Sequence, residues 1–286
     1  MNKKRLGKMV GIILVSFLVL LVPANTQIAA APDGYYSTPA VGQICLMAFN
    51  YAPQGWADCN GSLMLISQNQ ALYSLIGTKF GGSGSTFALP NLQSPIPGTR
   101  YCIALDGMYP PQDGGSFNDP ILGQIDLFPY DFTPAGWLRC EGQTIQLSQN
   151  TALFSILGFN YGGDGATNFK IPDLRGTEPN NNIHYCMATQ GLYPIEGSYS
   201  NTGGDLIGSI ILFPRARFEG AQGISNGICD GNTLNIATDN RLFASIGTTY
   251  GGDGTSTFAK PDLRGAVPDP RLGFYIQVGG SWPVHP

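Results

Sequence analysis

Residues 55–92 read GWADCNGSLMLISQNQALYSLIGTKFGGSGSTFALPNL, and the chain repeats this stretch twice more. The second version is GWLRCEGQTIQLSQNTALFSILGFNYGGDGATNFKIPDL at 136–174, and the third is CDGNTLNIATDNRLFASIGTTYGGDGTSTFAKPDL at 229–263. Gly42 and Gly123, which open the first two copies, are 81 residues apart. This period is too long for a solenoid repeat of about 20 to 50 residues, so we expect each copy to be a small domain or subdomain.

The first thirty residues have the three parts of a secretory signal. A start with four basic residues precedes an apolar run at 10–23, and small residues follow up to Ala30. The run has 14 residues, short of the roughly 20 that a spanning helix needs. We therefore predict cleavage after Ala30 and a secreted or cell-surface protein that meets a membrane only through its signal. The alternative is an uncleaved membrane anchor.

The predicted domain organisation follows from the signal and the repeats. It comprises a signal peptide at 1–30, an N-terminal arm at 31–41, and three copies at 42–121, 122–206 and 207–286. The arm would either pair with a sheet edge of a neighbouring molecule or stay disordered. Removing the signal changes the net charge from −4 to −8, because it takes away four positive charges and no negative one. An acidic surface does not attract phosphate backbones, so no nucleic-acid partner is expected.

Six cysteines in an exported chain indicate disulfides rather than catalytic thiols. There is no C-x-x-C pair, and only His184 and His285 could assist, so we expect no zinc site. Cys59, Cys140 and Cys229 share one repeated position, while Cys102 and Cys186 share a second that we align with Ile276 in copy three. Cys45 has no cysteine counterpart.

Two regular disulfide patterns remain open. Bonds within copies would join Cys59 to Cys102 and Cys140 to Cys186. Cys45 and Cys229 would then tie copy one to copy three, or one chain to the next. Bonds between successive copies would instead join Cys102 to Cys140 and Cys186 to Cys229, and would leave Cys45 with Cys59. Fifteen pairings are formally open for six cysteines.

Short strands are expected at the start and end of each copy. The opening runs are GQICLMAF at 42–49, GQIDLFPY at 123–130 and GSIILFPR at 208–215. The closing runs are RYCIALDGMYP at 100–110, HYCMATQGLYP at 184–194 and FYIQVGGSWP at 274–283, which we expect to form edge strands.

One short helix is predicted in the middle of each copy. Ala71, Leu72, Leu75 and Ile76 recur at helical spacing and would form one buried face, and Gly77 would end the helix with a positive φ. The stretch from Ser67 to Gln70 resembles a capping box, in which the serine hydroxyl accepts from the first turn. In copy three, Thr238 or Asp239 would take over this role.

Glycine-rich loops follow the helices, and we read Gly82, Gly163 and Gly252 in them as structural anchors. The loops lack the Lys-Ser/Thr that completes a phosphate-binding loop, which favours tight turns with positive φ angles. A calcium role for Asp164 and Asp253 is disfavoured because copy one has Ser83 there.

Two tryptophans before the repeated cysteine, Trp56 and Trp137, are predicted to be packing anchors rather than sugar platforms, because large aromatics usually serve cores. Copy three has a four-residue insertion here and lacks the tryptophan.

Together these motifs resemble the phage tail collar domain. The combined pattern is aromatic-x-Pro-x-Gly-Trp-x-x-Cys-x-Gly, a Ser-Gln-Asn-x-Ala-Leu helix, Phe/Tyr-Gly-Gly-x-Gly and Pro-Asn/Asp-Leu, and it falls on 51–92, 132–174 and, weakened, 218–263. The resemblance implies membership of a group found in phage short tail fibres and in bacterial exported proteins called microcystin-dependent. Phage members are typically trimeric, non-enzymatic parts of attachment devices. Three fused copies would then form an intramolecular pseudo-trimer; independent beads on a string are the alternative.

The residues favour a structural protein over an enzyme. Residues beside the repeated cysteine differ in chemistry between copies, and no nucleophile elbow or metalloprotease motif is present. We therefore expect no catalytic residues, cofactor or metal, and a mainly β protein with one short helix per copy. Its predicted function is a self-associating subunit of a cell surface or extracellular filament. The alternative is an adhesin that binds a surface glycan through exposed aromatics such as Tyr109 and Tyr193, with Tyr35, Tyr36 and Tyr199 as further candidates.

Overall fold

The computed structural model describes residues 38–114, 120–194, 206–215 and 227–284. The chain divides into two units, residues 1–33 and 34–286, and all described residues belong to the second. The predicted signal peptide, most of the N-terminal arm, Tyr35, Tyr36, Tyr199 and His285 lie outside the described residues.

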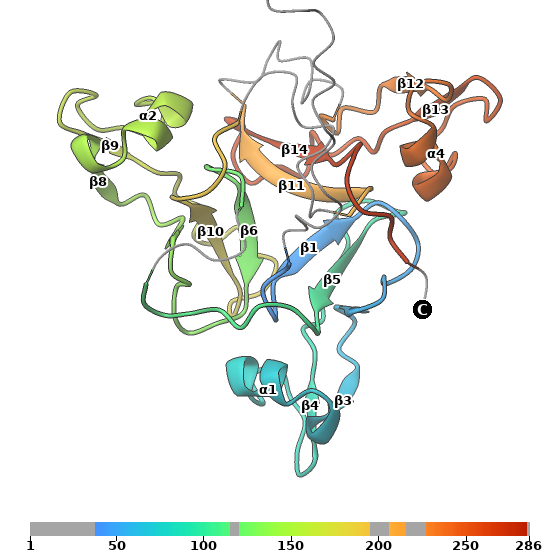
Figure 1. The fold of residues 1–286 in the computed structure, drawn as a ribbon, viewed down its shortest axis with the longest axis horizontal. Coiled ribbons are helices and arrows are strands. Elements are labelled where there is room, and N and C mark those ends of the chain that lie inside the picture. The colour runs from blue at the N-terminus through green and yellow to red at the C-terminus, as the bar shows by residue number, and fades with distance from the viewer. Residues whose placement is uncertain (1–37, 115–119, 195–205, 216–226, 285–286) are drawn as a thin grey trace, which may run out of the picture. The chain divides into compact units, whose positions relative to one another are not determined.

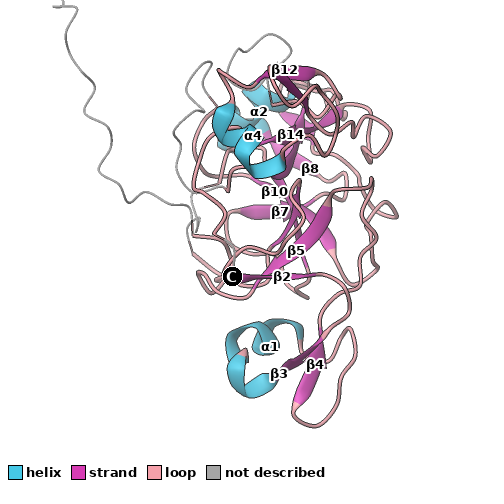
Figure 2. Cartoon of the chain, turned by 90° about the vertical axis from the view of Figure 1, so that its right-hand side faces the viewer, coloured by secondary structure: helices cyan, strands magenta, loops and turns pink. Residues whose placement is uncertain are grey.

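The described part is mainly β with short α-helices, as predicted, and the elements recur in the same order in each copy (Figures 1 and 2). Copy one contains β1 (Ile44–Met47), β2 (Trp56–Asp58), β3 (Leu63–Leu65), α1 (Gln70–Ile76), β4 (Thr86–Ala88) and β5 (Arg100–Ala104). Copy two contains β6 (Ile125–Phe128), β7 (Trp137–Arg139), β8 (Thr144–Gln146), α2 (Thr151–Leu157), β9 (Asn168–Lys170) and β10 (His184–Ala188). Copy three contains β11 (Ser209–Pro214), β12 (Thr233–Asn235), α4 (Asn240–Ile246), β13 (Thr257–Ala259) and β14 (Leu272–Ile276).

Strands from all three copies share one antiparallel sheet. Its order is β2-β5-β1-β11-β6-β10-β7, and β14 also pairs with β11. The opening strands β1, β6 and β11 each pair with both of the others. Ile44 lies opposite Leu127, Leu46 opposite Ile210, and Leu212 opposite Ile125. The sheet therefore curls, because β1 and β6 are separated by β11 in the order and still pair directly.

The closing strands are not edge strands in the first two copies, which corrects the expectation. β5 lies between β1 and β2, and β10 lies between β6 and β7. The reason is that the segments beginning at Trp56 and Trp137, which look like the end of a turn, continue as short strands and pair on the outer side. In copy three the described counterpart is only an isolated bridge between Ile228 and Tyr275.

The strand register also corrects the alignment of copy three. Tyr275 lies opposite Ile211, as Cys102 lies opposite Cys45 and Cys186 opposite Asp126. The counterpart of the second repeated cysteine is therefore Tyr275 and not Ile276. Tyr275 stands five residues before Gly280, just as Cys102 and Cys186 stand five residues before Gly107 and Gly191.

The helix prediction is confirmed in position, with two corrections in detail. Leu72, Leu75 and Ile76 are buried, and Gly77 has φ +55°, but Ala71 is exposed. The capping box is wrong: a single 3-10 turn precedes α1, Asn69 is the N-cap, and no side chain caps the helix. The same arrangement holds in copy two. In copy three Asp239 is the N-cap, again without a side-chain bond to the helix.

Candidate functional site

The contacts between copies are the first candidate site. Each copy has a hairpin–helix segment, at 63–88, 144–170 and 233–259, in which the helix lies beside a two-stranded hairpin. After α1, the Lys79 Nζ donates to the Pro129 carbonyl at 3.0 Å and pairs with the Asp131 carboxylate at 2.8 Å. The hairpin–helix segment of copy one is thereby tied to copy two.

The other two segments make contacts at the equivalent place. In copy two, the Tyr161 ring lies 4.3 Å from the Arg271 guanidinium of copy three, which also donates to the Asn160 carbonyl at 2.7 Å. In copy three, the Tyr250 hydroxyl lies 2.9 Å from the Ala48 carbonyl and 2.7 Å from the Gly98 carbonyl of copy one. The contacts thus run from copy one to two, from two to three, and from three back to one.

The glycines that open the copies pack against aromatic rings of another copy. A Cβ on Gly42 would come within 2.9 Å of the Tyr130 ring, one on Gly208 within 2.9 Å of the Phe49 ring, and one on Gly123 within 3.5 Å of the Phe213 ring. Each glycine has a φ between +86° and +88°. The Tyr130 hydroxyl, from copy two, also donates to the Val41 carbonyl beside Gly42.

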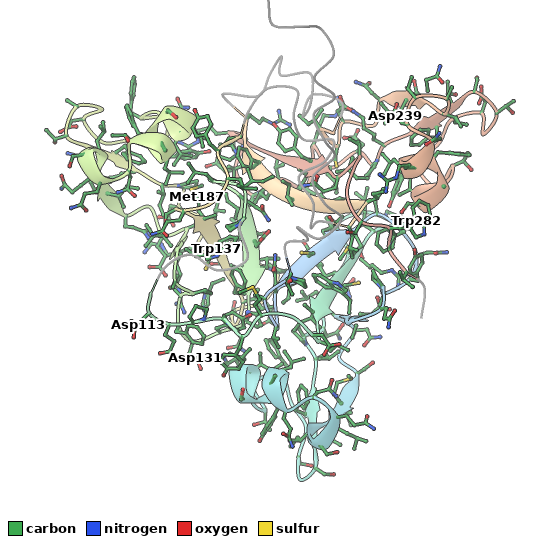
Figure 3. The ribbon with its side chains drawn as sticks, viewed as in Figure 1. Asp113, Asp131, Trp137, Met187, Asp239 and Trp282 are labelled. Atoms are coloured by element: carbon green, nitrogen blue, oxygen red, sulfur yellow. The ribbon has the colours of Figure 1, made fainter. Side chains whose placement is uncertain are left out.

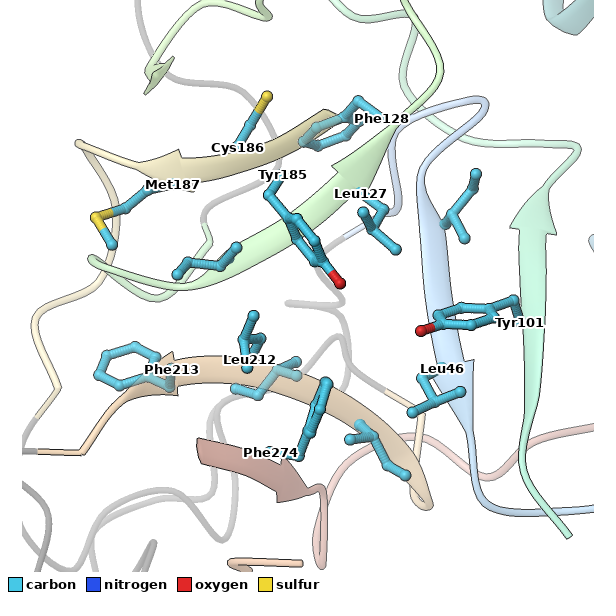
Figure 4. Packing of buried hydrophobic residues seen from close by; sticks show 14 of the residues in the cluster. Leu46, Tyr101, Leu127, Phe128, Tyr185, Cys186, Met187, Leu212, Phe213 and Phe274 are labelled. Atoms are coloured by element: carbon cyan, nitrogen blue, oxygen red, sulfur yellow. The ribbon is translucent and has the colours of Figure 1, made fainter. Parts of the chain in front are cut away.

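A small cavity of about 20 Å³ lies where the three opening strands meet. Its lining includes the isoleucine and leucine of each strand, together with Tyr101, Tyr185 and Phe274 from the closing strands. The hydroxyls of Tyr101 and Tyr185 point toward its interior in Figure 4. Burial and the neighbouring Cys59 raise the pKa of Tyr101 to about 12, and burial and Tyr101 raise the pKa of Tyr185. The cavity has room for about one water molecule.

A polar link lies beside this cavity. Asp126 is buried, and its carboxylate accepts hydrogen bonds from the Gln43 side chain of copy one at 2.8 Å and from Gln124 at 2.9 Å. The same glutamines accept from the backbone amides of Ala40 and Ile121. A buried carboxylate held by such donors fixes strand positions, which is a structural rather than a catalytic arrangement.

Exposed aromatics form the second candidate site. Tyr109 is 55% exposed with its hydroxyl 3.0 Å from Ser74 Oγ, and Tyr193 is 39% exposed with its hydroxyl 2.8 Å from Ser155 Oγ. Trp282 holds the corresponding place in copy three and is 45% exposed (Figure 3). We did not predict Trp282, although its Trp-Pro pair matches the Tyr-Pro pairs of the other copies.

The predicted packing anchors differ in burial. Trp137 is 3% exposed and meets the Phe128 ring edge-on at a centroid distance of 5.0 Å. Trp56 is half-buried and packs on a cluster formed by Met47, Phe49 and Cys102.

The predicted positive φ angles in the glycine-rich loops are confirmed, with values of +96° at Gly82 and Gly252 and +99° at Gly163. Asp164 and Asp253 occupy their loops as hydrogen-bond acceptors. The Asp164 Oδ1 accepts three backbone amides, and its Oδ2 accepts from Thr167 and Asn168. The Asp253 Oδ1 also accepts three backbone amides, and its Oδ2 accepts from the Ser256 hydroxyl. These hydrogen bonds hold the pKa values of both aspartates below the usual range of a carboxyl. They explain the presence of an aspartate at these positions without invoking a bound cation.

The six cysteines are all described, and each is a thiol in the structure. Five are buried and Cys45 is half-buried. Burial is the largest influence on Cys59, Cys102, Cys140, Cys186 and Cys229 and raises their pKa values. A raised pKa keeps a thiol protonated and poorly nucleophilic, so these cysteines are unsuited to catalysis. Their pairing stays a prediction.

Among described residues, no three His, Cys, Asp or Glu side chains gather where they could hold a metal ion. Burial and the nearby Arg139 lower the pKa of His184. Within the described ranges, the helices are too short or too polar to cross a bilayer.

The family of the chain follows from a comparison with protein-family models. The model of the phage tail collar domain matches three times, at residues 42–97, 123–179 and 208–268. The chain belongs to this family, with one match in each predicted copy. The family is one of structural, fibre-like proteins and is not an enzyme family. No match was found among curated proteins or solved structures.

Proposed function

We propose that the chain is an exported, non-enzymatic structural protein whose three collar domains form an intramolecular pseudo-trimer. The observation that supports this most is the cyclic set of contacts between copies, in which each opening strand pairs with the other two and Lys79, Tyr161 and Tyr250 each reach the next copy. In a chain of independent beads, no contact would need to return from copy three to copy one. A single chain would then form the assembly that three separate chains form in a trimeric collar protein.

The proposed place of this protein is the cell surface or an extracellular filament. The support is its membership of a fibre-like structural family, together with the predicted signal peptide. The surfaces that join the three copies are already occupied within one chain. Self-association between chains would therefore use other surfaces, outside the shared sheet.

A cleavage experiment tests the pseudo-trimer. A specific protease site is inserted between residues 115 and 119 and another between 195 and 205, and the chain from residue 31 is cut at both under reducing conditions. We expect the three fragments to elute together, at the same position as the uncut protein, and to separate in urea. Fragments that separate without urea would support beads on a string and contradict the pseudo-trimer.

Electron microscopy of the uncut protein tests the filament. Ordered filaments or rings support a structural subunit. A uniform single-chain particle that forms no assembly contradicts it and favours the second candidate, a glycan-binding adhesin.

The exposed aromatic side chains support the second candidate function, a glycan-binding adhesin. Tyr109, Tyr193 and Trp282 recur at one place in the three copies, and two are oriented by serine hydroxyls. Aromatic faces at such sites stack on the apolar faces of sugar rings. Replacing all three by alanine should abolish binding on a glycan array without changing the unfolding midpoint by more than a few degrees. Array binding that survives the triple replacement would count against these residues.

A further inference from the structure

Cys45, the cysteine without a counterpart in the other copies, has a cysteine opposite it. In the β1–β5 pair, Cys45 lies directly opposite Cys102. Directly opposite residues of an antiparallel pair have Cα atoms about 4.5 to 5.5 Å apart. A disulfide bridges Cα atoms about 4.4 to 6.8 Å apart, so the register places the two cysteines at a spacing that a disulfide can bridge.

The two side chains also lie on one face of the sheet. Opposite residues in a ladder point to the same side, and successive residues alternate. Cys102 belongs to a buried cluster with Met47 and Phe49, against which Cys45 and Trp56 pack. Both cysteines therefore belong to one cluster, at whose border the Gln43 side chain donates to the Cys45 Sγ at 3.8 Å and the Cys102 Sγ donates to Asp58 at 3.6 Å.

Cys59, the partner of Cys102 in the within-copy pattern, lies on the other face. The Cys59 amide donates to the Tyr101 carbonyl at 2.9 Å, so Cys59 continues the ladder opposite Tyr101, whereas Cys102 lies opposite Asp58. Cys140 and Cys186 have the same relation, because the Cys140 amide donates to the Tyr185 carbonyl and Cys186 lies opposite Arg139. Alternation along the strand thus directs each of these pairs to opposite faces.

We infer that Cys45 and Cys102 form the disulfide of this protein under oxidising conditions, and that the other four cysteines remain thiols. The bond fastens β1 to β5 within copy one. Copy two has Asp126 and Cys186 at these positions, and copy three has Ile211 and Tyr275, so copy one alone carries it. The inference holds whether or not the proposed function is correct.

The chemistry needs an oxidant, for which a small-molecule disulfide such as oxidised glutathione suffices. The thiolate of half-buried Cys45 attacks it, forms a mixed disulfide and releases one glutathione thiol. The Cys102 thiol, which donates a hydrogen bond to the Asp58 carboxylate at 3.6 Å, then loses its proton as its sulfur attacks the Cys45 sulfur, and the second glutathione leaves as a thiol. Two protein thiols lose two electrons and two protons, and one glutathione disulfide becomes two thiols.

The test is disulfide mapping of the full chain. The protein is purified without reductant, equilibrated with oxidised glutathione, denatured in excess maleimide and digested. We expect one cross-linked peptide pair, containing Cys45 and Cys102, and maleimide on the other four of the six cysteines. Six labelled cysteines, or a linked pair of any other composition, would overturn the inference.

Variants supply the matched controls. Cys45→Ser should leave all five remaining cysteines labelled, whereas Cys140→Ser should keep the linked pair. Reductant should lower the thermal unfolding midpoint of the unaltered protein by roughly 10 °C and leave that of Cys45→Ser unchanged. A reductant effect of equal size in both proteins would contradict the assignment.

Discussion

Replacing Gly82 by alanine tests whether the glycine-rich loops are shaped by backbone sterics. Gly82 has φ +96°, and a Cβ there would lie 2.4 Å from Phe87 Cα and 2.7 Å from the Thr86 carbonyl oxygen. Both atoms belong to the backbone of β4, so no side chain can rotate away. The matched control is Gly77→Ala, because Gly77 also has a positive φ, +55°, but a Cβ there meets nothing within 4 Å.

The structure gives different magnitudes for the two variants. Alanine in a backbone conformation that is essentially restricted to glycine costs about 1 to 3 kcal/mol, which is the whole expectation for Gly77→Ala at φ +55° and ψ −140°. Gly82→Ala adds the displacement of a packed strand, about 1 to 3 kcal/mol more, for a total of about 2 to 6 kcal/mol. Native domains are stable by about 5 to 15 kcal/mol, so the variant should fold with a clearly reduced free energy of unfolding.

Urea unfolding, followed by circular dichroism, measures both values. Gly163 and Gly252 have equivalent contacts, at 2.5 Å and 2.4 Å, so their alanine variants should lose as much as Gly82→Ala. A loss for Gly82→Ala no greater than that for Gly77→Ala would refute the steric argument. If the copies unfold as one cooperative unit, each variant should shift a single transition.

Three further predictions concern the charges and contacts. Lys260 is 3% exposed and pairs with Asp230 at 3.1 Å, so Asp230→Asn should cost about 3 to 5 kcal/mol in chemical unfolding, while the added change Lys260→Leu should recover most of it. Tyr250→Phe removes the hydroxyl that contacts two carbonyls of copy one and should cost about 1 kcal/mol by the same assay; no change would count against that contact. Hydrogen bonds from neighbouring arginines lower the pKa values of Asp173 and Asp262 from 3.8 to about 2, so their stabilisation is complete above about pH 4 and is lost as pH falls toward 2. Thermal scans across this range should show the decline, and it should be shallower when both are changed to asparagine.

Short sequence patterns predicted the positions of strands and helices well, because these positions depend on the side chains of neighbouring residues. The apolar runs after Gly42, Gly123 and Gly208 became strands, and the helical spacing of Leu72, Leu75 and Ile76 became a buried helix face. The capping box failed on equally local grounds, since a 3-10 turn already occupies Ile66–Gln68 and leaves Asn69 to begin the helix.

Pairing partners could not be predicted from the same patterns. An apolar run of four to six residues shows that a strand is half or fully buried, but it carries no information about which strand lies beside it. The error at Ile276 has another origin, because Tyr275 precedes Trp282 by seven residues, as Cys102 precedes Tyr109, and this spacing was overlooked. The ladder to Ile211 confirms Tyr275 as the equivalent residue. Trp282 was overlooked although the sequence alone aligns Trp282-Pro283 with the Tyr-Pro pairs at Tyr109 and Tyr193.

The sequence by itself determined that the chain holds three copies of one unit, where their strands and helices lie, and that the unit is a phage tail collar domain. These properties depend on spacing and on side-chain chemistry within about forty residues. Only the tertiary structure decided that the opening strands pair with one another, that Lys79, Tyr161 and Tyr250 each contact another copy, and that Cys45 faces Cys102. Those contacts join residues that are 50 to 200 positions apart, and their free energy depends on a three-dimensional register that no single stretch of the chain encodes.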